Sequence, residues 1–454
     1  MSFPRYPKYK DSGVEWLGEV PEHWAIDRLK RSTIVAKNGI WGDEPRQDEN
    51  DIPCVRVADF DRQALRVELT EPTIRNVVEK ERVGRVLSRG DLLLEKSGGG
   101  EGQPVGCVVL YDDPRPAVCS NFVARVQTAP DMNSSFWRYV HAAAYAVRIN
   151  TRSIKQTSGI QNLDASQYLD ERAGFPPPTE QIQIAAFLDR ETAKIDELVT
   201  EQRRLMELLK EKRQAVIFHA VTQGLNPDAP MKPSGIEWLG NLPAHWRVMP
   251  LGRVTVSRCD GPFGSGLKSD HYTESGVRVI RLQNIRRDSF NGSDEAFIDA
   301  DYYESELSGH DVASGDVLIA GLGDDKNTVG RACVAPVGIE PAMVKADCFR
   351  YRLDTDQAFP EFVATQLSAS SVADAGMMAS GSTRSRIPLS VMATRKLAIP
   401  PISEQKEIAA FIQASTLKFD TLTAESQRAI DLLQERRSAL ISAAVTGQID
   451  VRPH

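Results

Sequence analysis

The stretch Ser-Gly-Val-Glu-Trp-Leu-Gly at residues 12–18 returns as Ser-Gly-Ile-Glu-Trp-Leu-Gly at residues 234–240. Both copies are followed, at the same spacing, by a proline and a His-Trp pair, which is His23-Trp24 in the first copy and His245-Trp246 in the second. Tryptophan and histidine are uncommon residues, so this agreement does not arise by chance. The chain therefore predicts a tandem duplication of a unit of about 225 residues.

A second repeated block lies near the end of each unit. A proline pair leads into Glu180-Gln181 and then Ile184-Ala-Ala-Phe187, and the same pattern returns as Pro400-Pro401, Glu404-Gln405 and Ile408-Ala-Ala-Phe411. The segments between the two blocks are nearly equal in length. Prolines are tolerated before a helix and in its first turn but not inside it, so each pair predicts a helix start.

Composition sets broad limits on the class of protein. The chain has 454 residues with 41% hydrophobic and 26% charged residues, which is ordinary for globular proteins and allows a sizeable core in each half. No apolar run approaches the length of a membrane span, and the first residues do not resemble a signal peptide, so we expect a cytoplasmic protein without a membrane partner. The six cysteines are scattered without metal-ligand spacing, which argues against both a disulfide framework and a zinc site. A formal net charge of −7 gives no global reason to bind nucleic acid, so any such site must be a local basic patch.

The segments between the repeated blocks read as mixed α/β globules. Short runs typical of β-strands, at 52–57, 91–94 and 105–110, alternate with turns that contain Gly, Asp or Pro. The second half repeats this order at 276–282, 315–319 and 329–334. The Gly90-Asp91 and Gly315-Asp316 turns align, whereas most residues around them differ. The two globules thus share a scaffold and have diverged on their surfaces.

A long helix follows each globule. Residues 180–221 contain no Pro or Gly and are dominated by strong helix formers. We assign their seam to Ile195, Leu198, Leu205, Leu209 and Val216, with Gln202 and Lys212 as polar members; the second copy keeps this register at Phe419, Leu422, Ala429, Leu433 and Leu440, with Ser426 and Arg436. A seam this narrow predicts that the two helices pack on each other as a coiled coil. The alternative is that each helix lies on its own globule.

The sequence contains no recognisable catalytic site. The glycine-rich run at 98–102 lacks the lysine and hydroxyl of a phosphate loop, and the prolines lack the flanking residues of an amino-methyltransferase motif. Asp91, Glu95 and Lys96 resemble a nuclease cluster faintly, but the second copy has Ala320 and Gly321 at the corresponding places. We expect neither a catalytic residue nor a metal ligand, and we assign His23 and His245 to packing or hydrogen bonding at a domain junction.

Polar and basic residues suited to DNA gather in the divergent segments. One cluster precedes the first helix, a second occupies the matching place before the second helix, a third follows the strand near residue 280, and two pairs lie after the aligned Gly-Asp turns. Arginine and lysine can bind phosphates or guanine, and asparagine and glutamine can bind adenine. For any single residue an ordinary solvated side chain is an equal alternative. The candidate DNA contacts are Lys96, Ser97, Arg152, Lys155, Gln156, Gln161, Asn162, Arg281, Gln283, Asn284, Lys326, Asn327, Ser382, Thr383, Arg384 and Arg386.

The doubled motifs resemble the specificity subunit of type I restriction-modification systems. The resemblance rests on the repeated Trp-containing blocks, on the Pro-Pro-x-x-Glu-Gln helix starts, and on helix ends that read Ala220-Val221-Thr222 and Ala444-Val445-Thr446-Gly447. It extends over essentially the whole chain in the expected order. In that family each globule is a target recognition domain that reads one half of a split DNA sequence, and the long helices form an antiparallel coiled coil that sets the spacing between the halves.

The resemblance also implies partners. The subunit is expected to be non-catalytic and to assemble on double-stranded DNA with two modification subunits, which methylate adenine, and two restriction subunits, which translocate and cleave DNA. S-adenosylmethionine, ATP and Mg²⁺ are then expected only on those partners. The expected domains are a repeat segment at 1–24, recognition domains at 25–175 and 231–398, and spacer helices within 176–230 and 399–454.

Two other functions remain open from the residues alone. The chain could be a scaffold that uses its coiled coil to join two protein ligands without touching DNA. It could also be an enzyme with an unfamiliar active site, although no matched acid, base or nucleophile supports that reading.

Overall fold

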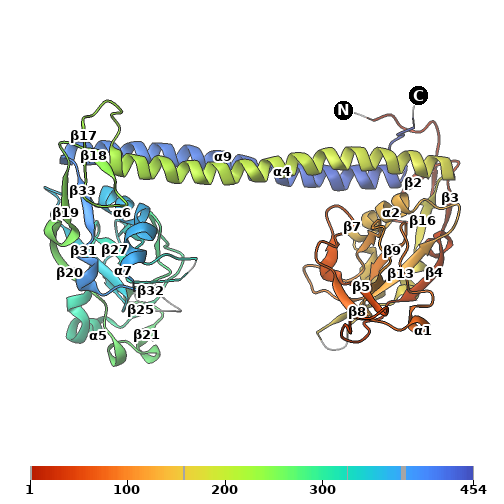
Figure 1. Cartoon of the computed structure of the whole chain (residues 1–454), viewed down its shortest axis with the longest axis horizontal. Helices are drawn as coiled ribbons and strands as arrows, with labels where there is room; N and C mark the ends of the chain where they lie inside the picture. The colour runs from red at the N-terminus through yellow and green to blue at the C-terminus, as the bar shows by residue number, and fades with distance from the viewer. Residues whose placement is uncertain (1–2, 157–158, 325, 380–384, 453–454) are drawn as a thin grey trace. The chain divides into compact units, whose positions relative to one another are not determined.

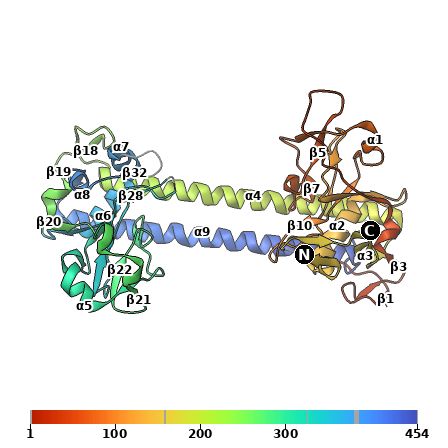
Figure 2. The same cartoon turned by 90° about the horizontal axis from the view of Figure 1, so that it is seen from below.

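A computed structural model describes residues 3–156, 159–324, 326–379 and 385–452. The chain divides into two compact units: unit 1 comprises 1–203 and 426–454, and unit 2 comprises 204–425. Each unit contains one globule, one half of the helix α4 (Pro178–Gln223) and one half of the helix α9 (Ile402–Val445). Figures 1 and 2 show these two helices in yellow-green and blue.

The globule of unit 1 is built on a six-stranded sheet. Its strand order is β4 (Thr33–Asn38), β13 (Val123–Thr128), β9 (Leu92–Glu95), β11 (Val108–Leu110), β7 (Arg66–Val67) and β6 (Phe60–Asp61). Helix α2 (Ser134–Ala146) buries Phe136, Trp137 and Val140 in the core that this sheet shares. A second sheet joins β12 (Val118–Cys119), β5 (Asp51–Val55) and β8 (Thr73–Asn76).

The globule of unit 2 repeats this plan. A four-stranded sheet has the order β20 (Thr255–Cys259), β31 (Cys348–Leu353), β27 (Val317–Ala320) and β29 (Ala332–Val334), and helix α6 (Pro360–Ala369) packs against β27 and β29 (Figure 1). These four strands correspond in order to β4, β13, β9 and β11. The second sheet joins β21 (Tyr272–Thr273), β25 (Phe297–Ile298), β22 (Val277–Ile280), β30 (Ala342–Val344) and β26 (Asp311–Val312). The predicted duplication of a mixed α/β globule is confirmed.

The two long helices run antiparallel. In unit 1, Ile184 and Leu188 near the start of α4 share a core with Ile441 near the end of α9. In unit 2, the end of α4, with Ile217 and Val221, shares a core with Ile408 near the start of α9. The sequence alone predicted that the helices pair, and the antiparallel direction that the family resemblance implied is present in both units.

Three of the seven seam positions predicted in the first helix were wrong by one residue. The positions at 195, 202, 209 and 216 are buried or half-buried as expected, but Leu198 and Leu205 are 52% and 42% exposed, and Lys212 is exposed. The seam instead runs through Val199, Met206 and Arg213. The second helix shows the same difference, because Leu422 is 45% exposed and Arg436 is exposed, while the seam takes positions 423, 430 and 437. Counted from position 195, successive seam residues are therefore separated alternately by four and by three residues. The prediction took the opposite order, three then four, because Leu198 and Leu205 are more apolar than the seam residues that follow them.

Each helix ends at a glycine with a positive φ. Gly224 has φ 77° and Gly447 has φ 73°, the conformation that commonly closes a helix. A Cβ on Gly447 would lie 2.2 Å from Cδ of Pro21, so the close approach of the two segments also requires glycine. The chain after α9 continues against the N-terminal segment, where the amide of Asp450 donates to the carbonyl of Pro4.

The expectations about membrane-spanning helices and about the cysteines can be compared with the described residues. None of the helices in that part of the chain is long and apolar enough to cross a membrane. All six cysteines are free thiols, and burial raises the pKa of Cys107 to about 11.

Candidate nucleic-acid interface

A glutamate in the first turn of each long helix holds the repeated His-Trp pair. Glu180 accepts hydrogen bonds from Nε1 of Trp24 at 3.0 Å and lies 2.8 Å from Nε2 of His23. In unit 2, Glu404 binds Trp246 at 3.0 Å and His245 at 2.7 Å in the same way. The repeated motifs are thus two halves of one junction between globule and helix, as the assignment of the histidines to a domain junction predicted.

The neighbouring glutamine completes each junction. Gln181 donates to the carbonyl of Pro176 at 3.0 Å and accepts from the amide of Asn133, which caps α2. Gln405 donates to Pro400 at 2.9 Å and accepts from the amide of Phe359, which precedes α6. Each glutamine therefore fixes a globule helix to the start of a long helix. The junction therefore fixes the orientation of each globule on the start of its long helix.

The aspartate of the Gly-Asp turns is structural. Asp91 accepts from Nε of Arg125 and from the amide of Ser88, both at 2.7 Å. Asp316 accepts from the amide of Ala313 at 2.7 Å and from Nη2 of Arg352 at 2.8 Å. Among the described residues no group of three or more His, Cys, Asp or Glu side chains could hold a metal ion.

Six predicted residues of the first globule gather in and beside a small sheet, here called the first edge sheet. It consists of β10 (Ser97–Gly98), β15 (Gln161–Leu163) and β14 (Ile154–Gln156), and it follows directly from the core strand β9. Segments more than 50 residues apart in the sequence meet here. The side chains that it brings together are Lys96, Ser97, Lys155, Gln156, Gln161 and Asn162.

The exposed members of this sheet are partly held in place. Ser97 donates its hydroxyl to Oδ1 of Asn162 at 2.6 Å, and Nζ of Lys96 donates to Oδ1 of Asn38 at 2.6 Å. Nζ of Lys155 donates to Asp164 at 2.8 Å, which lowers the pKa of that carboxyl. Gln156 is exposed, and its backbone pairs with Gln161 across the sheet. The sheet thus presents amide, hydroxyl and ammonium groups from a fixed backbone.

Two of the predicted residues in this globule have other surroundings. Gln161 is buried and its side-chain oxygen accepts from the amide of Val105 at 3.2 Å, so in this structure it supports the glycine-rich loop. Arg152 lies before β14 and pairs with Glu15 at 3.5 Å and Glu171 at 3.8 Å, which offsets its charge.

The second globule has a corresponding edge, here called the second edge sheet. It pairs β28 (Leu322–Gly323) with β32 (Ser385–Arg386), as β10 pairs with β15 in the first globule. Arg386 donates to Asp347 at 2.8 Å and lies over the ring of Phe263 at 5.2 Å. The predicted residues Ser382, Thr383 and Arg384 lie outside the described residues.

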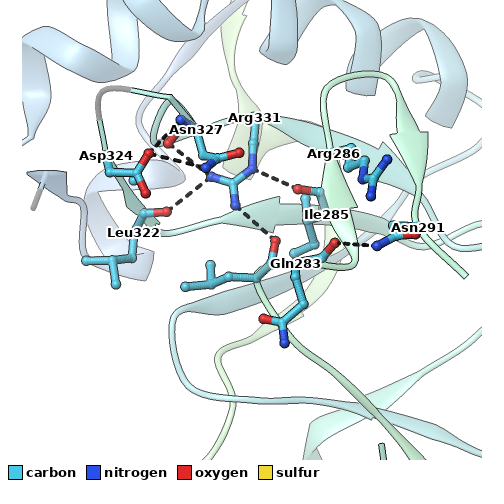
Figure 3. Close-up of a pocket in the computed structure, with 10 residues that line it drawn as sticks. Gln283, Ile285, Arg286, Asn291, Leu322, Asp324, Asn327 and Arg331 are labelled. Atoms are coloured by element: carbon cyan, nitrogen blue, oxygen red, sulfur yellow. Dashed lines mark hydrogen bonds between the residues drawn. The ribbon is translucent and has the colours of Figure 1, made fainter. Parts of the chain in front are cut away.

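A pocket of about 380 Å³ lies beside β28 (Figure 3). Buried Arg331 forms its floor by donating to the carbonyls of Ile285 at 2.7 Å and Leu282 at 2.9 Å. Its polar rim combines the predicted residues Gln283 and Asn327 with Arg286, Asn291 and Asp324.

The loop that carries Asn327 is shaped by Asp324. The amides of Asn327 and Lys326 donate to Oδ1 of Asp324 at 2.7 and 2.9 Å and lower the pKa of this carboxyl. Asp324 therefore offers acceptors, whereas Lys326 and Asn327 are exposed and offer donors. A surface with both kinds of group can distinguish base edges in a major groove.

The placement of Asn284 corrects one prediction. Asn284 is fully buried: its oxygen accepts from the amide of Arg281 at 2.7 Å, and its nitrogen donates to the carbonyls of Asn291 and Asp294. The equivalent turn of the first globule has Asp59, which accepts from the amide of Arg56 at 2.7 Å. Asn284 therefore builds the loop and does not face solvent, and a comparison of these two turns in the sequence would have revealed it. Arg281 pairs with Asp294 at 2.6 Å at the base of the same loop.

Sequence reasoning missed two exposed aromatic residues at equivalent positions of the two globules. Trp41 follows β4 and Phe263 follows β20, and both rings are exposed. An arginine lies over each ring, Arg75 over Trp41 at 4.6 Å and Arg386 over Phe263 at 5.2 Å. Each aromatic residue stands two positions after a glycine that packs against backbone, Gly39 before Trp41 and Gly261 before Phe263. This repeated spacing is the signal in the sequence that could have identified them. The Phe263–Arg386 pair offers both a flat surface and a cation to nucleic acid, whereas Arg75 is buried and pairs with Glu44, so Trp41 offers only its ring.

Comparisons with known proteins agree with this arrangement. No protein-family model matches the chain. The type I restriction enzyme EcoKI specificity subunit of Escherichia coli K12 is 22% identical over 443 residues, which cover 95% of this chain and 90% of that protein. The putative type I restriction enzyme MjaX specificity subunit of Methanocaldococcus jannaschii is 23% identical over 455 residues, which cover 96% of each chain.

Solved structures share the fold. A chain from a study of complex assembly and conformational transition in the type I R-M system matches with a TM-score of 0.71 and 15% identity, over 94% of this chain and 98% of its own length. The HsdS subunit of Thermoanaerobacter tengcongensis matches with a TM-score of 0.56 and 15% identity, over 95% of this chain and 98% of its own. Over nearly its whole length the chain is thus similar to type I restriction-modification specificity subunits. It has two globules whose junctions are alike and whose edge sheets differ.

Proposed function

We propose that this specificity subunit reads a bipartite, asymmetric DNA sequence, with one globule for each half-site. The first edge sheet reads one half, and the second edge sheet together with the rim of the adjacent pocket reads the other. The observation that carries this proposal is the location of sequence divergence. The two halves keep the same junction atoms, yet present Ser97 with Asn162 in one globule and Leu322 with Arg386 at the equivalent pairs of the other.

The chemistry of the edge sheets suits this role. Asparagine and glutamine amides pair with adenine, and an arginine such as Arg386 pairs with guanine or a phosphate. Aspartate can accept from cytosine, which is the kind of group that Asp324 offers. Both edge sheets also carry lysine or arginine for the phosphate contacts that supply affinity.

The paired helices are proposed to set the distance between the half-sites. A continuous helix of 46 residues, the length of α4, extends for about 69 Å. Half-sites that face the same side of B-DNA are separated by multiples of about 34 Å, so a spacer of this length is of the right order. Deleting one heptad from both helices should therefore change or abolish the recognised spacing without changing the bases read.

The partners follow from the duplicated plan. Two similar units offer two similar docking surfaces, which suits two modification subunits and two restriction subunits on one specificity subunit. In this proposal methylation with S-adenosylmethionine, and ATP- and Mg²⁺-dependent cleavage, take place on those partners in the cytoplasm. The specificity subunit itself contributes only recognition and geometry.

The experiment that tests recognition measures sequence-selective DNA binding by the assembled complex. Purified chain with its modification subunits should retain a subset of genomic fragments at fixed salt, and Arg386→Glu should abolish that selection while the complex still assembles. Arg253→Glu is the matched control, because it makes the same charge change at an exposed arginine in η4 (Leu251–Val254). This helix precedes the start of β20, whereas Phe263, the contact of Arg386, follows the end of that strand. We expect Arg253→Glu to bind as wild type.

A scaffold that only joins proteins predicts a different result. If DNA were irrelevant to the chain, wild type would show no selective retention and Arg386→Glu would be silent. Either outcome would overturn the proposal.

A further inference from the structure

A turn of the first globule is attached directly to the helix pair. The turn at residues 62–65 joins β6 to β7, and Nε2 of its Gln63 donates to Oδ1 of Asp196 on α4 at 2.9 Å. Arg437 on α9 donates Nε to the same oxygen at 3.0 Å and Nη2 to Oδ2 at 3.3 Å. One carboxylate thus joins the globule and both helices. Gln63, Asp196 and Arg437 are called the first clamp.

The first clamp is held in a fixed geometry. Oδ1 of Asp61 accepts the amides of Gln63 at 2.9 Å and Ala64 at 2.8 Å, which shapes the turn. Arg437 is buried and Asp196 is half-buried, so the bonds between them are partly shielded from water. Charge-assisted hydrogen bonds with two fixed partners resist rotation of the globule about the helices.

Unit 2 contains the same parts in an equivalent place. The turn at residues 287–288 joins β23 (Ile285–Arg286) to β24 (Ser289–Phe290), and it follows the Asn284 cap as the first turn follows the Asp59 cap. Arg213 on α4 and Asp420 on α9 occupy the repeat positions of Arg437 and Asp196.

In unit 2, however, these parts do not close. Nε of Arg213 lies 3.6 Å from Oδ1 of Asp420, which is too long for a hydrogen bond, and this buried nitrogen has no hydrogen-bond partner among the described residues. Asp288 likewise has one buried oxygen without a hydrogen-bond partner there. Two cavities of about 420 and 440 Å³ lie against Arg213, Ile217 and Asp288, whereas the cavity beside Arg437 in unit 1 has about 190 Å³.

We propose that Gln63, Asp196 and Arg437 are positioning residues that hold the first globule at one angle on the helix pair. The second globule, whose equivalent contact is open, then supplies whatever tolerance the complex has for the distance between half-sites. This inference rests on the proposed function. Adding one base pair moves a half-site by about 3.4 Å along the DNA, a shift that a held globule cannot follow.

The test is the distance preference of the assembled complex. DNA from cells that carry the specificity subunit with its modification subunits is sequenced for methylation. The measured ratio compares sites of native half-site distance with sites one base pair longer or shorter. Gln63→Ala and Asp196→Asn should each lower this ratio about tenfold, the effect of losing one hydrogen bond to a charged group, without changing the bases read. Asp196→Glu, which keeps the charge, should restore part of it.

Asp420→Asn is the matched control, because it makes the same change at the equivalent position of the open contact, and the ratio should stay within about twofold of wild type. An unchanged ratio in both Gln63→Ala and Asp196→Asn would overturn the inference, as would an equal loss of methylation at every distance, which is what a merely structural role predicts. If wild type itself methylated no bipartite motif, the proposed function would fail instead, so the two failures are distinguishable.

Discussion

The junctions of the two units are nearly identical, whereas the side chains of their edge sheets have diverged. At the junctions, a glutamate, a tryptophan and a histidine meet at nearly identical distances in both units. At the edge sheets, the backbone pairing is repeated but the side chains are not, since Asn162 stands where the second unit has Arg386. A scaffold that presents two different surfaces in the same way needs junctions that are alike and edge sheets whose side chains differ.

The junctions also differ in one respect that experiment can exploit. Glu180 is 5% exposed and accepts a third bond from the hydroxyl of Tyr6 at 2.6 Å, whereas Glu404 is 26% exposed and, among the described residues, accepts side-chain bonds from the His-Trp pair alone. Burial and the neighbouring Glu180 raise the pKa of Tyr6, so its hydroxyl remains a donor. The first junction should therefore contribute more to stability than the second.

The largest predicted effect is the loss of the first junction. Glu180→Ala leaves the buried donors of Trp24 and Tyr6 without an acceptor, and we expect the free energy of unfolding of unit 1 to fall by about 4 kcal/mol. Glu404→Ala should cost unit 2 about 2 kcal/mol, because water can replace part of the lost bonds. Urea unfolding of the full chain measures both, with hydrogen exchange assigning the loss to a unit. Equal losses would contradict the distinction between the junctions.

The next effect concerns the edge sheets. Asn162→Ala should relax base preference in the first half-site only, and Arg386→Ala in the second only, each by about 1 to 3 kcal/mol of discrimination. Methylation-sensitive sequencing of cells with the full complex reports both half-sites at once. A change in both halves from a single substitution would mean that the globules do not read independently.

A smaller effect distinguishes the two clamp turns by pH. Burial raises the pKa of Asp288 from 3.8 to about 6, whereas the first turn carries the uncharged Gln63. Between about pH 4 and pH 6 the carboxyl of Asp288 is ionised in the unfolded chain but still protonated in the folded chain. Its contribution to the free energy of unfolding is therefore complete below pH 4 and is lost as the pH rises through about 6. Asp288→Asn should therefore stabilise unit 2 by about 2 kcal/mol at pH 7.5 and leave it unchanged near pH 3.5. Chemical unfolding at both pH values tests this, and a gain that does not depend on pH would refute it.

The smallest effect is expected at Lys155. Its pairing with Asp164 is exposed to solvent, so Lys155→Gln should leave stability unchanged. If Lys155 binds a phosphate, affinity should fall for all DNA sequences alike, and the slope of log affinity against log salt should decrease by about one. Titrations over a range of salt concentrations measure this slope. A sequence-dependent loss would assign Lys155 to base reading instead.

Much of the fold was predictable because the duplication provides an internal comparison. Two copies of the His-Trp and Glu-Gln blocks marked the junctions, and the absence of Pro and Gly marked both long helices. The alternate seam positions were not predictable from apolarity, since Leu198 is more apolar than Arg213 and yet lies on the exposed side. Arg213 occupies a seam position with Asp420 of the other helix 3.6 Å away, and a neighbour on another helix cannot be identified from the apolarity of α4 itself.

The clustering of the candidate DNA-contact residues in the first globule was predictable in outline. Position near the divergent segments identified six residues that meet at the first edge sheet, although they come from two distant stretches of the chain. Residue type alone could not distinguish the exposed Asn162 from the buried Asn284, because both side-chain amides are suited to DNA. Only the loop geometry decides that the amide of Asn284 hydrogen-bonds to backbone groups, while Asn162 stays at the surface.

The most direct test of the account replaces the first globule by the second. A chain in which residues 247–399 stand in place of residues 25–175, between intact junctions, should assemble with its modification subunits and methylate a symmetric motif built from two inverted copies of the second half-site. Sequencing of methylated DNA reads this motif directly. Retention of the original first half-site by this chain would contradict the claim that each globule reads its own half on a common scaffold.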